Sequence, residues 1–362
     1  MERPTIALLA SYPMKPNIQA VLYNLGRLLR DEFTFDLIMG PEGPPEQLQG
    51  LYETFPFRPH LKLNGLGFAF TATRKYLNSY QPDAIINAGQ PFPLGLAIVS
   101  LGNWYDVPTI LRVTGDYFAE SEIGSMWERR KRKLLHGILF NAVYQNADVA
   151  IPVGQNLADK LLRNGFEEEQ VYPLPQPFDP EPFSALSLAE RRQLKEELGL
   201  ELGRKTVLFV GRLSWGKGAD RVLEIAKGVH QKSREFQFCL VGDGKYVSDF
   251  QRQFAAEEVF CAGYVPRERV PEYFKVADLL IHPSRRDALP NVILEALAAR
   301  VPVIASPVGE MSNLISHTSH EIEDYVRYIL EKNWKYNDLP KCLNWITQKK
   351  NYTKLLKRVV GK

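Results

Sequence analysis

Ala277-Asp278-Leu279-Leu280-Ile281-His282-Pro283-Ser284 leads, after two arginines, into Asp287-Ala288-Leu289-Pro290-Asn291-Val292-Ile293-Leu294-Glu295. The first part is a short apolar run closed by a breaker, which predicts a buried parallel strand. Pro290 disfavours helix before it, Asn291 is a candidate N-cap, and the residues from Val292 onward favour a helix. This order of strand, loop and helix places the loop at the carboxyl edge of a parallel sheet.

Two acidic residues, Asp287 and Glu295, stand in this loop and one turn into the following helix. Free backbone N–H groups at a helix start favour an anion. A carboxylate at Glu295 can accept hydrogen bonds from two hydroxyls of a ribose. The stretch therefore indicates a nucleotide-sugar pocket, and an ordinary first-turn glutamate favoured by the helix dipole is the structural alternative.

Length and composition indicate a soluble globular protein of two domains, with 362 residues, 45% hydrophobic and 24% charged. We expect it in the cytoplasm, because no apolar run reaches the roughly 20 residues of a membrane-spanning helix and the first residues lack the layout of a signal peptide. Cys239, Cys261 and Cys342 show no Cys-x-x-Cys pairing. We expect neither a disulfide nor a metal site.

The net charge of +3 is too small to indicate a nucleic-acid partner. Its distribution is uneven, since residues 1–183 hold 16 Lys and Arg against 20 Asp and Glu, and the remainder hold 29 against 22. A basic second half suits a domain that binds phosphates, although solvated surface charge explains so modest a difference equally well.

Strand-like segments alternate with helical intervals along the whole chain, which predicts two doubly wound α/β domains with parallel sheets. A proline-dense stretch at 172–183 separates the two series and indicates a stiff linker. The predicted domains are residues 1–175, a linker and entry helix at 176–204, a second domain at 205–338 and a helical tail at 339–362. The predicted strands are 5–10, 35–39, 84–87, 109–113 and 149–153 in the first domain, and 206–210, 236–241, 259–262, 279–282 and 302–305 in the second.

Two further segments combine cations with apolar residues. Residues 349–362 have Leu355, Leu356, Val359 and Val360 at helical spacing, which predicts a terminal helix docked by this stripe. Residues 127–135 hold five cations beside a tryptophan and two leucines. Contact with an anionic membrane is one interpretation of the second segment, and a solvated helix face is the other.

Glycine-rich loops follow three strands of the second series. Arg212 and Lys217 lie in the first loop, where a guanidinium and an ammonium group together suit a diphosphate. The loop lacks the Walker pattern, and two loop cations taken alone are more often solvated. Glycines after the other strands allow close approach of backbone to a ligand, and the three loops meet the acidic pair at one sheet edge. The glycines in question are Gly211, Gly242, Gly244 and Gly263.

From Val207 to about Ile315 these motifs resemble the retaining glycosyltransferases of family 4, which have the GT-B fold of two facing Rossmann-like domains. The resemblance is thinner in the first half, where it includes residues 146–153 and 171–179. It implies that the terminal helix crosses back to the first domain, that Arg212 and Lys217 bind the donor diphosphate, that Glu295 binds the ribose, and that Asp287 binds the sugar hydroxyls. It also implies donor contacts from Val265, Leu289, Asn291 and Val292.

By the same resemblance the first domain holds the acceptor, with Asn17, Thr114 and Asp116 near the reacting centre. Several positions depart from the family pattern: Asp287 replaces a usual Glu, Ala288 a usual Gly and Thr114 a frequent His. A Gly-Gly pair near Asn17 is absent, as is an Asp-Gly-x-x-Gly-Leu segment after Ile315.

The resemblance implies transfer of a sugar from a nucleoside-diphosphate sugar to an acceptor hydroxyl with retained configuration. We expect front-face transfer without a cofactor or metal, because no matching carboxylate is placed as a nucleophile and no Asp-x-Asp motif is present. The expected acceptor is a cell-envelope glycan, glycolipid or polysaccharide, reached by a cytoplasmic enzyme that touches the inner membrane face. The rivals are a nucleotide-sugar or glycan-binding protein without catalysis and, third, a sugar-nucleotide epimerase.

Overall fold

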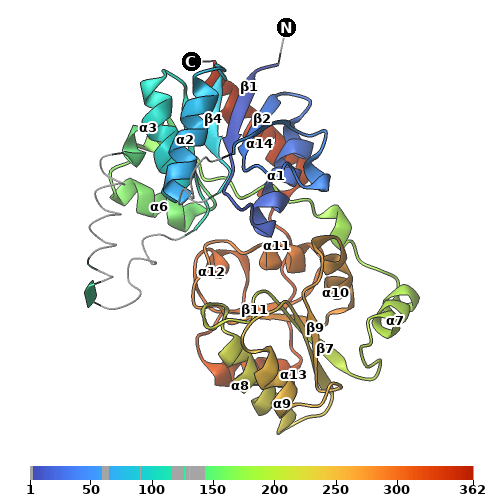
Figure 1. The fold of residues 1–362 in the computed structure, drawn as a ribbon. Coiled ribbons are helices and arrows are strands. Elements are labelled where there is room, and N and C mark those ends of the chain that lie inside the picture. The colour runs from blue at the N-terminus through green and yellow to red at the C-terminus, as the bar shows by residue number, and fades with distance from the viewer. Residues whose placement is uncertain are drawn as a thin grey trace. The chain divides into compact units, whose positions relative to one another are not determined.

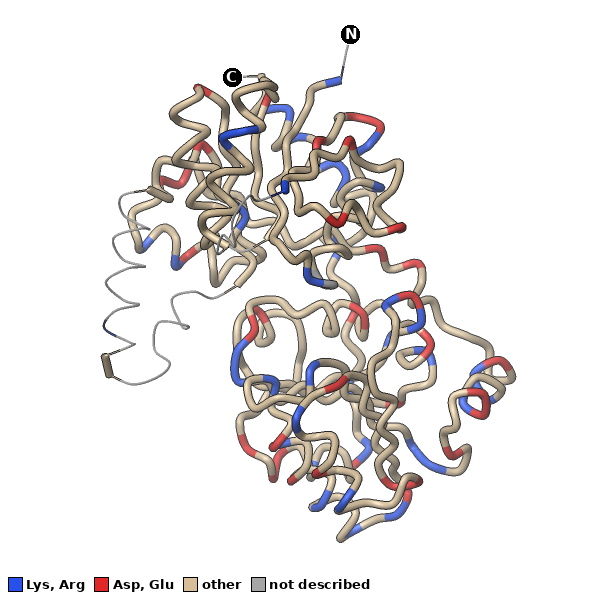
Figure 2. The backbone as a smooth tube through the Cα atoms, in the orientation of Figure 1, with Lys and Arg blue, Asp and Glu red and all other residues tan. Residues whose placement is uncertain are grey.

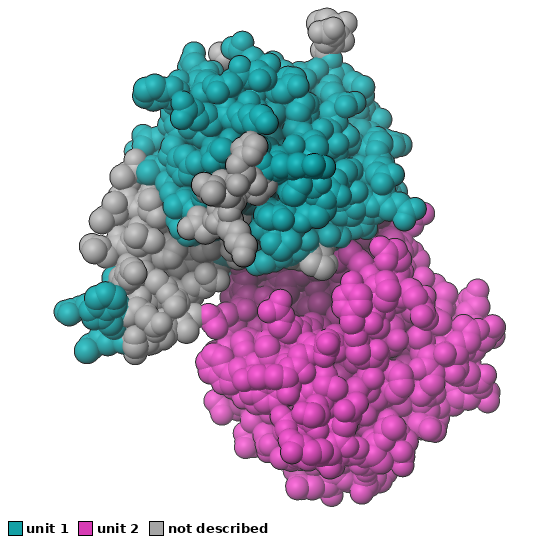
Figure 3. All heavy atoms as spheres, in the orientation of Figure 1, with its two compact units in different colours: residues 1–178, 342–362 teal, residues 179–341 magenta. Residues whose placement is uncertain are grey.

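The computed structural model describes residues 3–58, 65–89, 91–115, 126–127, 130 and 143–361 (Figure 1). The chain forms two compact units, residues 1–178 together with 342–362, and residues 179–341 (Figure 3). The divisions at 178 and 341 fall a few residues after the boundaries predicted at 175 and 338. Residues 179–204, predicted as linker and entry helix, lie in the second unit.

The first unit is built on a six-stranded parallel sheet of order β3-β2-β1-β4-β5-β6. Apart from β3, its strands are apolar runs that are mostly buried, as expected where helices cover a parallel sheet. Sequence reasoning missed β3, a short strand that pairs only with β2 and ends at a proline. The strands are β1 (Thr5–Leu9), β2 (Thr34–Met39), β3 (Glu53–Pro56), β4 (Ala84–Asn87), β5 (Thr109–Val113) and β6 (Val149–Pro152), and the helices are α1 (Pro16–Leu29), α2 (Gly65–Leu77), α3 (Leu96–Trp104), α6 (Gln155–Arg163) and α14 (Trp345–Val360).

The second unit has a five-stranded parallel sheet of order β11-β10-β7-β8-β9. Its core joins the inner faces of these strands to α8 and α13. The strands are β7 (Lys205–Val210), β8 (Phe236–Val241), β9 (Val259–Gly263), β10 (Leu279–His282) and β11 (Val303–Ala305). The helices are α7 (Leu188–Glu197), α8 (Ala219–His230), α9 (Val247–Gln253), α10 (Val270–Val276), α11 (Asn291–Ala298), α12 (Met311–Leu314) and α13 (Ile322–Glu331).

The terminal helix α14 completes the first unit, as predicted. Leu355, Leu356 and Val359 are buried in the core formed with β1, β2 and α1, and each contributes about 2 kcal/mol of hydrophobic stabilisation. The buried amide of Gln348 accepts a hydrogen bond from the backbone N–H of Phe178 at 3.0 Å and donates one to its carbonyl at 2.9 Å. The helix is therefore tied to the residue at which the chain leaves the unit.

Both units are doubly wound α/β sheets, so the predicted fold class is confirmed. Figure 2 shows Lys and Arg interspersed with Asp and Glu along both units. Within the described ranges, every helix is too short or too polar to span a bilayer. Trp127 of the cationic segment is 75% exposed, and most of residues 127–135 lie outside the described residues.

Candidate functional site

Three glycine loops at the carboxyl edge of the second sheet pack backbone against backbone. Gly242 has a φ of +135°, and a Cβ atom there would lie 2.1 Å from the carbonyl oxygen of Gly211. At Gly244, with a φ of +156°, a Cβ atom would lie 2.2 Å from the carbonyl oxygen of Leu213. Gly242 also donates its N–H to the carbonyl of Gly263 at 2.8 Å. Only glycine fits such contacts, so the residue pattern fixes the shape of this edge.

Lys217 and Asp287 meet at this edge from two different loops. Lys217 ends a 3-10 turn (Trp215–Lys217) between β7 and α8, and Asp287 lies between β10 and α11. The Nζ atom of Lys217 lies 2.5 Å from Oδ1 of Asp287, and the Asp287 side chain is only 13% exposed. The two residues that the sequence assigned to the diphosphate and the sugar therefore form an ion pair.

His282 contacts the second oxygen of the same carboxylate. Its Nε2 lies 2.9 Å from Oδ2 of Asp287, and its side chain is 2% exposed at the end of β10. Burial by itself raises the pKa of Asp287, but the hydrogen bond and charge of His282, together with Lys217, hold that pKa well below its usual range. Asp287 is thus ionised throughout the neutral range. His282 therefore positions the Asp287 carboxylate.

Arg285 holds the two loops together. Its guanidinium group bonds both carboxylate oxygens of Asp220 at 2.8 and 2.6 Å and stacks 4.3 Å from the ring centre of Trp215. It also donates to the carbonyl of Trp215 at 2.6 Å. A bidentate, stacked arginine fixes the loop that carries Lys217 relative to the loop that carries Asp287. Sequence reasoning missed Arg285, although its place two residues before Asp287 was a signal.

Glu295 is almost completely buried in α11, at 3% exposure. Burial raises the pKa of its carboxyl group, and Arg267, with NH2 3.6 Å from Oε1, partly offsets this increase. Arg267 lies in the 3-10 turn (Arg267–Arg269) that follows β9. Arg267 is the one cation that pairs with this carboxylate within the described residues, so its oxygens retain hydrogen-bonding capacity for hydroxyl donors.

The other predicted donor residues surround these side chains. The α11 helix begins at Asn291 with Pro290 as N-cap, so the interpretation of Asn291 as N-cap was wrong. Leu289 is buried, whereas Asn291, Val292 and Val265 are half-buried. A Cβ atom at Gly263 would meet no atom within 4 Å, so the edge is open beside β9.

Arg212 projects into solvent from the first glycine loop. Arg286, directly before Asp287, is exposed too. Within the described part of the chain, neither guanidinium group forms an ion pair, so both are available to a negatively charged ligand.

The first unit has a cavity of about 310 Å³ at the carboxyl edge of its own sheet. Thr114, predicted on the acceptor side, lines it together with Tyr12, Lys15 and Phe68. Asn17 is the second residue of α1, and Asp116 lies outside the described residues.

Family comparisons agree with this arrangement of two sheets and one glycine-rich edge. The profile of Glycosyltransferase Family 4 matches residues 18–182, and that of Glycosyl transferases group 1 matches residues 190–358. The chain belongs to the family 4 glycosyltransferases. Its fold is therefore GT-B, as the sequence predicted.

Curated relatives of this glycosyltransferase are distant. It is 24% identical over 281 residues to mannosylfructose-phosphate synthase of Agrobacterium fabrum, covering 72% of this chain and 58% of the relative. It is 31% identical over 155 residues to a putative teichuronic acid biosynthesis glycosyltransferase of Bacillus subtilis, covering 40% of this chain and 38% of the relative. The glycosyltransferase spans about a quarter to three fifths of the length of the curated relatives it matches.

Among solved structures, Anabaena HepE in complex with UDP-glucose matches with a TM-score of 0.69 at 17% identity, covering 99% of this chain and 96% of that chain. At this identity the likeness concerns the fold of the glycosyltransferase alone.

Proposed function

We propose that the protein transfers a sugar from a nucleoside-diphosphate sugar to an acceptor hydroxyl with retention of configuration. The observation that carries the proposal is the cluster of Lys217, Asp287 and buried Glu295 at one sheet edge. The UDP-glucose complex of HepE, which shares the fold, supports a nucleotide-sugar donor.

Each residue has a distinct role in this proposal. Glu295 accepts hydrogen bonds from the ribose hydroxyls, and Arg212 with Lys217 holds the diphosphate. As the bond to the sugar breaks, negative charge grows on the leaving phosphate, and these two cations stabilise it. The phosphate oxygen takes the acceptor proton on the face from which it leaves, so the configuration is retained.

The contact with Lys217 indicates the role of Asp287 in the proposed reaction. Its carboxylate is shorter than the usual glutamate by one methylene and is already bonded by Lys217 and His282. It therefore sets the position of the Lys217 ammonium group and offers its remaining lone pairs to a sugar hydroxyl.

The proposed reaction needs neither a cofactor nor a metal, because Arg212 and Lys217 supply the positive charge for the diphosphate. A purified enzyme should transfer at the same rate in EDTA as in magnesium. A strict requirement for magnesium or manganese would contradict this part of the proposal.

The proposed acceptor is a glycan or lipid-linked hydroxyl of the cell envelope. Relatives include the putative teichuronic acid biosynthesis glycosyltransferase of Bacillus subtilis and an alpha-monoglucosyldiacylglycerol synthase of Streptococcus pneumoniae, and these names support this class of acceptor. Peripheral contact with the inner membrane face belongs to the same proposal.

Calorimetric titration of UDP, GDP and ADP tests the donor site. We expect one nucleotide to bind at micromolar concentration, and Glu295→Ala to weaken it at least tenfold. Glu272→Ala, which removes a partly exposed glutamate paired with Arg269, is the matched control and should leave binding unchanged. Donor binding without transfer or donor hydrolysis would favour a binding protein, and no binding of any nucleotide would overturn the proposal.

A further inference from the structure

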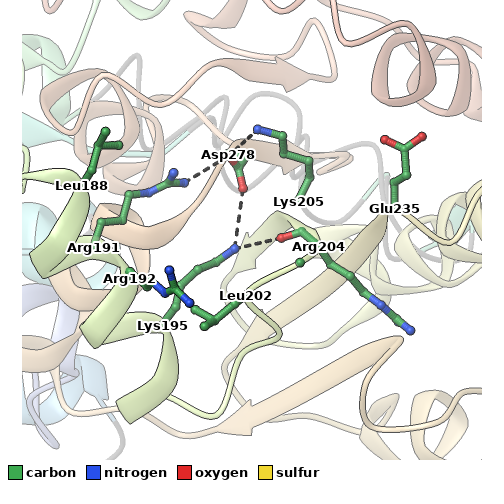
Figure 4. A pocket seen from close by; sticks show the side chains of 10 residues that line it. Leu188, Arg191, Arg192, Lys195, Leu202, Arg204, Lys205, Glu235 and Asp278 are labelled. Atoms are coloured by element: carbon green, nitrogen blue, oxygen red, sulfur yellow. Dashed lines mark hydrogen bonds and ion pairs between the residues drawn. The ribbon is translucent and has the colours of Figure 1, made fainter.

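A second polar cavity, of about 520 Å³, lies at the amino edge of the second sheet, at the opposite ends of the strands that carry the donor site. Helix α7 forms one wall, and the turn before β7 forms another (Figure 4). Helix α7 starts at a capping box in which Ser187 and Glu190 bond each other's backbone N–H groups. This start fixes the helix so that Arg191, Arg192 and Lys195 line the cavity.

One carboxylate at the floor of the cavity is surrounded by cations. Asp278, at the start of β10, has a side chain that is 9% exposed. Arg191 NH2 lies 3.1 Å, Lys205 Nζ 3.5 Å and Lys195 Nζ 3.9 Å from its oxygens. Dashed lines in Figure 4 mark these ion pairs. Three positive charges therefore converge on a single negative one.

Arg191 has a structural role, because its guanidinium group also donates hydrogen bonds to the carbonyls of Lys275, Val276 and Ala277 at the end of α10. Lys195 has fewer hydrogen-bond acceptors. Its side chain is only 8% exposed and its ammonium group has one backbone acceptor, the carbonyl of Arg204 at 2.9 Å. Burial lowers the pKa of Lys195, Asp278 partly opposes this, and the neighbouring Arg191 and Lys205 lower it further. With three cations around one carboxylate, the floor of the cavity has an excess of positive charge.

The rim adds further cations. Arg192 is 73% exposed, with Glu196 of its own helix 4.0 Å away, and Lys205 is 53% exposed. Arg204 lines the cavity as well. Glu235, the second acidic residue of the lining, is paired with Lys332, so it does not neutralise the rim. Leu188 and Leu202, both exposed, give the mouth an apolar border.

From this excess of positive charge we infer that the cavity at the amino edge binds a phosphate group, held by Arg192, Lys195 and Lys205. A phosphate dianion matches the charge of the floor and accepts hydrogen bonds from all three side chains. Its source is either a soluble phosphate compound or an anionic lipid headgroup, because both present the same oxygens. The site is separate from the donor site, so it stands whether or not the proposed transfer occurs.

Titration of inorganic phosphate by calorimetry at low ionic strength tests the site. We expect saturable binding that Arg192→Ser/Lys205→Ser weakens at least tenfold. Phosphate held by the glycine loop at the other edge should persist in this variant, so the difference reports the new site. The control is Lys227→Ser/Lys232→Ser, which also removes two positive charges. Lys227 lies on α8 and is paired with Glu224 of that helix, and Lys232 follows the helix. This control should change binding less than twofold.

A second arm separates the two sources of phosphate. A lipid headgroup would be identified if the wild type co-sediments with vesicles of phosphatidylglycerol and phosphatidylcholine but not with phosphatidylcholine alone. The Arg192→Ser/Lys205→Ser variant should then lose this co-sedimentation. Phosphate binding without vesicle binding would identify a soluble ligand. The inference fails if the wild type binds neither probe, or if both double variants weaken binding equally. Lys205→Gln is a milder variant that serves if the double variant unfolds at a lower temperature.

Discussion

The Nζ atom of Lys217 lies 2.5 Å from Oδ1 of Asp287, a residue 70 positions later in the chain. A donor diphosphate would compete with Asp287 for this ammonium group. The aspartate therefore acts on diphosphate binding in two opposite ways, since it holds Lys217 in place and also neutralises it.

Asp287→Asn removes that neutralising charge while keeping the size of the side chain. We expect nucleoside diphosphate to bind several-fold more tightly, whereas sugar transfer falls by about 100-fold or more, the scale seen when a transition-state contact is lost. Lys217→Met should instead weaken diphosphate binding about tenfold. Calorimetry and initial-rate assays on the same preparations measure both effects.

Asp243→Asn is the matched control for these variants, since Asp243 is an exposed carboxylate at the same sheet edge. It should change affinity less than twofold. Unchanged or weaker affinity in Asp287→Asn would mean that the loss of Lys217 positioning is at least as large as the gain from its freed charge.

The stability of the protein should depend on the buried carboxyl group of Glu295. Its pKa is raised in the folded state, so the native protein binds this proton more tightly than the unfolded chain does. This group therefore lowers stability as the pH rises through and above its unfolded pKa. Glu295→Gln should raise the free energy of unfolding by about 1 kcal/mol at pH 7, a common gain when a functional residue is neutralised.

Urea unfolding at pH 7 and pH 5 measures this gain, which should shrink at the lower pH. Glu272→Gln removes a partly exposed carboxylate and should change neither value. A loss of stability in Glu295→Gln at both pH values would mean that the contact with Arg267 outweighs the burial of the charge.

Gly309 packs closely against the loop that carries Asp287. Its φ is +58°, and a Cβ atom would lie 2.1 Å from the carbonyl oxygen of Ala288 and 2.2 Å from that of Asp287. Gly309→Ala should therefore displace the loop, with a loss of about 2 kcal/mol in stability and a larger fractional loss of transfer.

Thermal unfolding and rate assays test this expectation. Gly203→Ala is a suitable control, because a Cβ atom there meets no neighbour within 4 Å and the backbone is not left-handed. Equal, small effects of the two substitutions would show that the Asp287 loop tolerates movement.

The buried Gln348 anchors the terminal helix. Gln348→Ala would leave the backbone N–H and carbonyl of Phe178 without their partner, at a cost of about 2 kcal/mol. Chemical denaturation should show this loss, and Lys350→Ala, an exposed change two residues away, should be nearly neutral. An effect of Gln348→Ala below about 0.5 kcal/mol would mean that water replaces the amide.

The order of elements and the edge on which the site lies were predictable from sequence, because hydrophobic runs and glycine loops are local signals. The contact of Lys217 with Asp287 was not, since it depends on the conformations of two loops that are distant in sequence. The same holds for Arg267 beside Glu295 and for Arg285 on Trp215. Strand β3 was missed because Glu53–Pro56 is short, only half-buried and lacks an apolar run.

The first unit is discontinuous, since residues 342–362 join it after the whole second unit. During synthesis the amino-terminal sheet therefore emerges with an apolar face that its own last helix has yet to cover. The second unit, continuous in sequence, has all its parts before that helix is made. The first unit, whose sheet is translated first, can therefore finish folding only after α14 has been made.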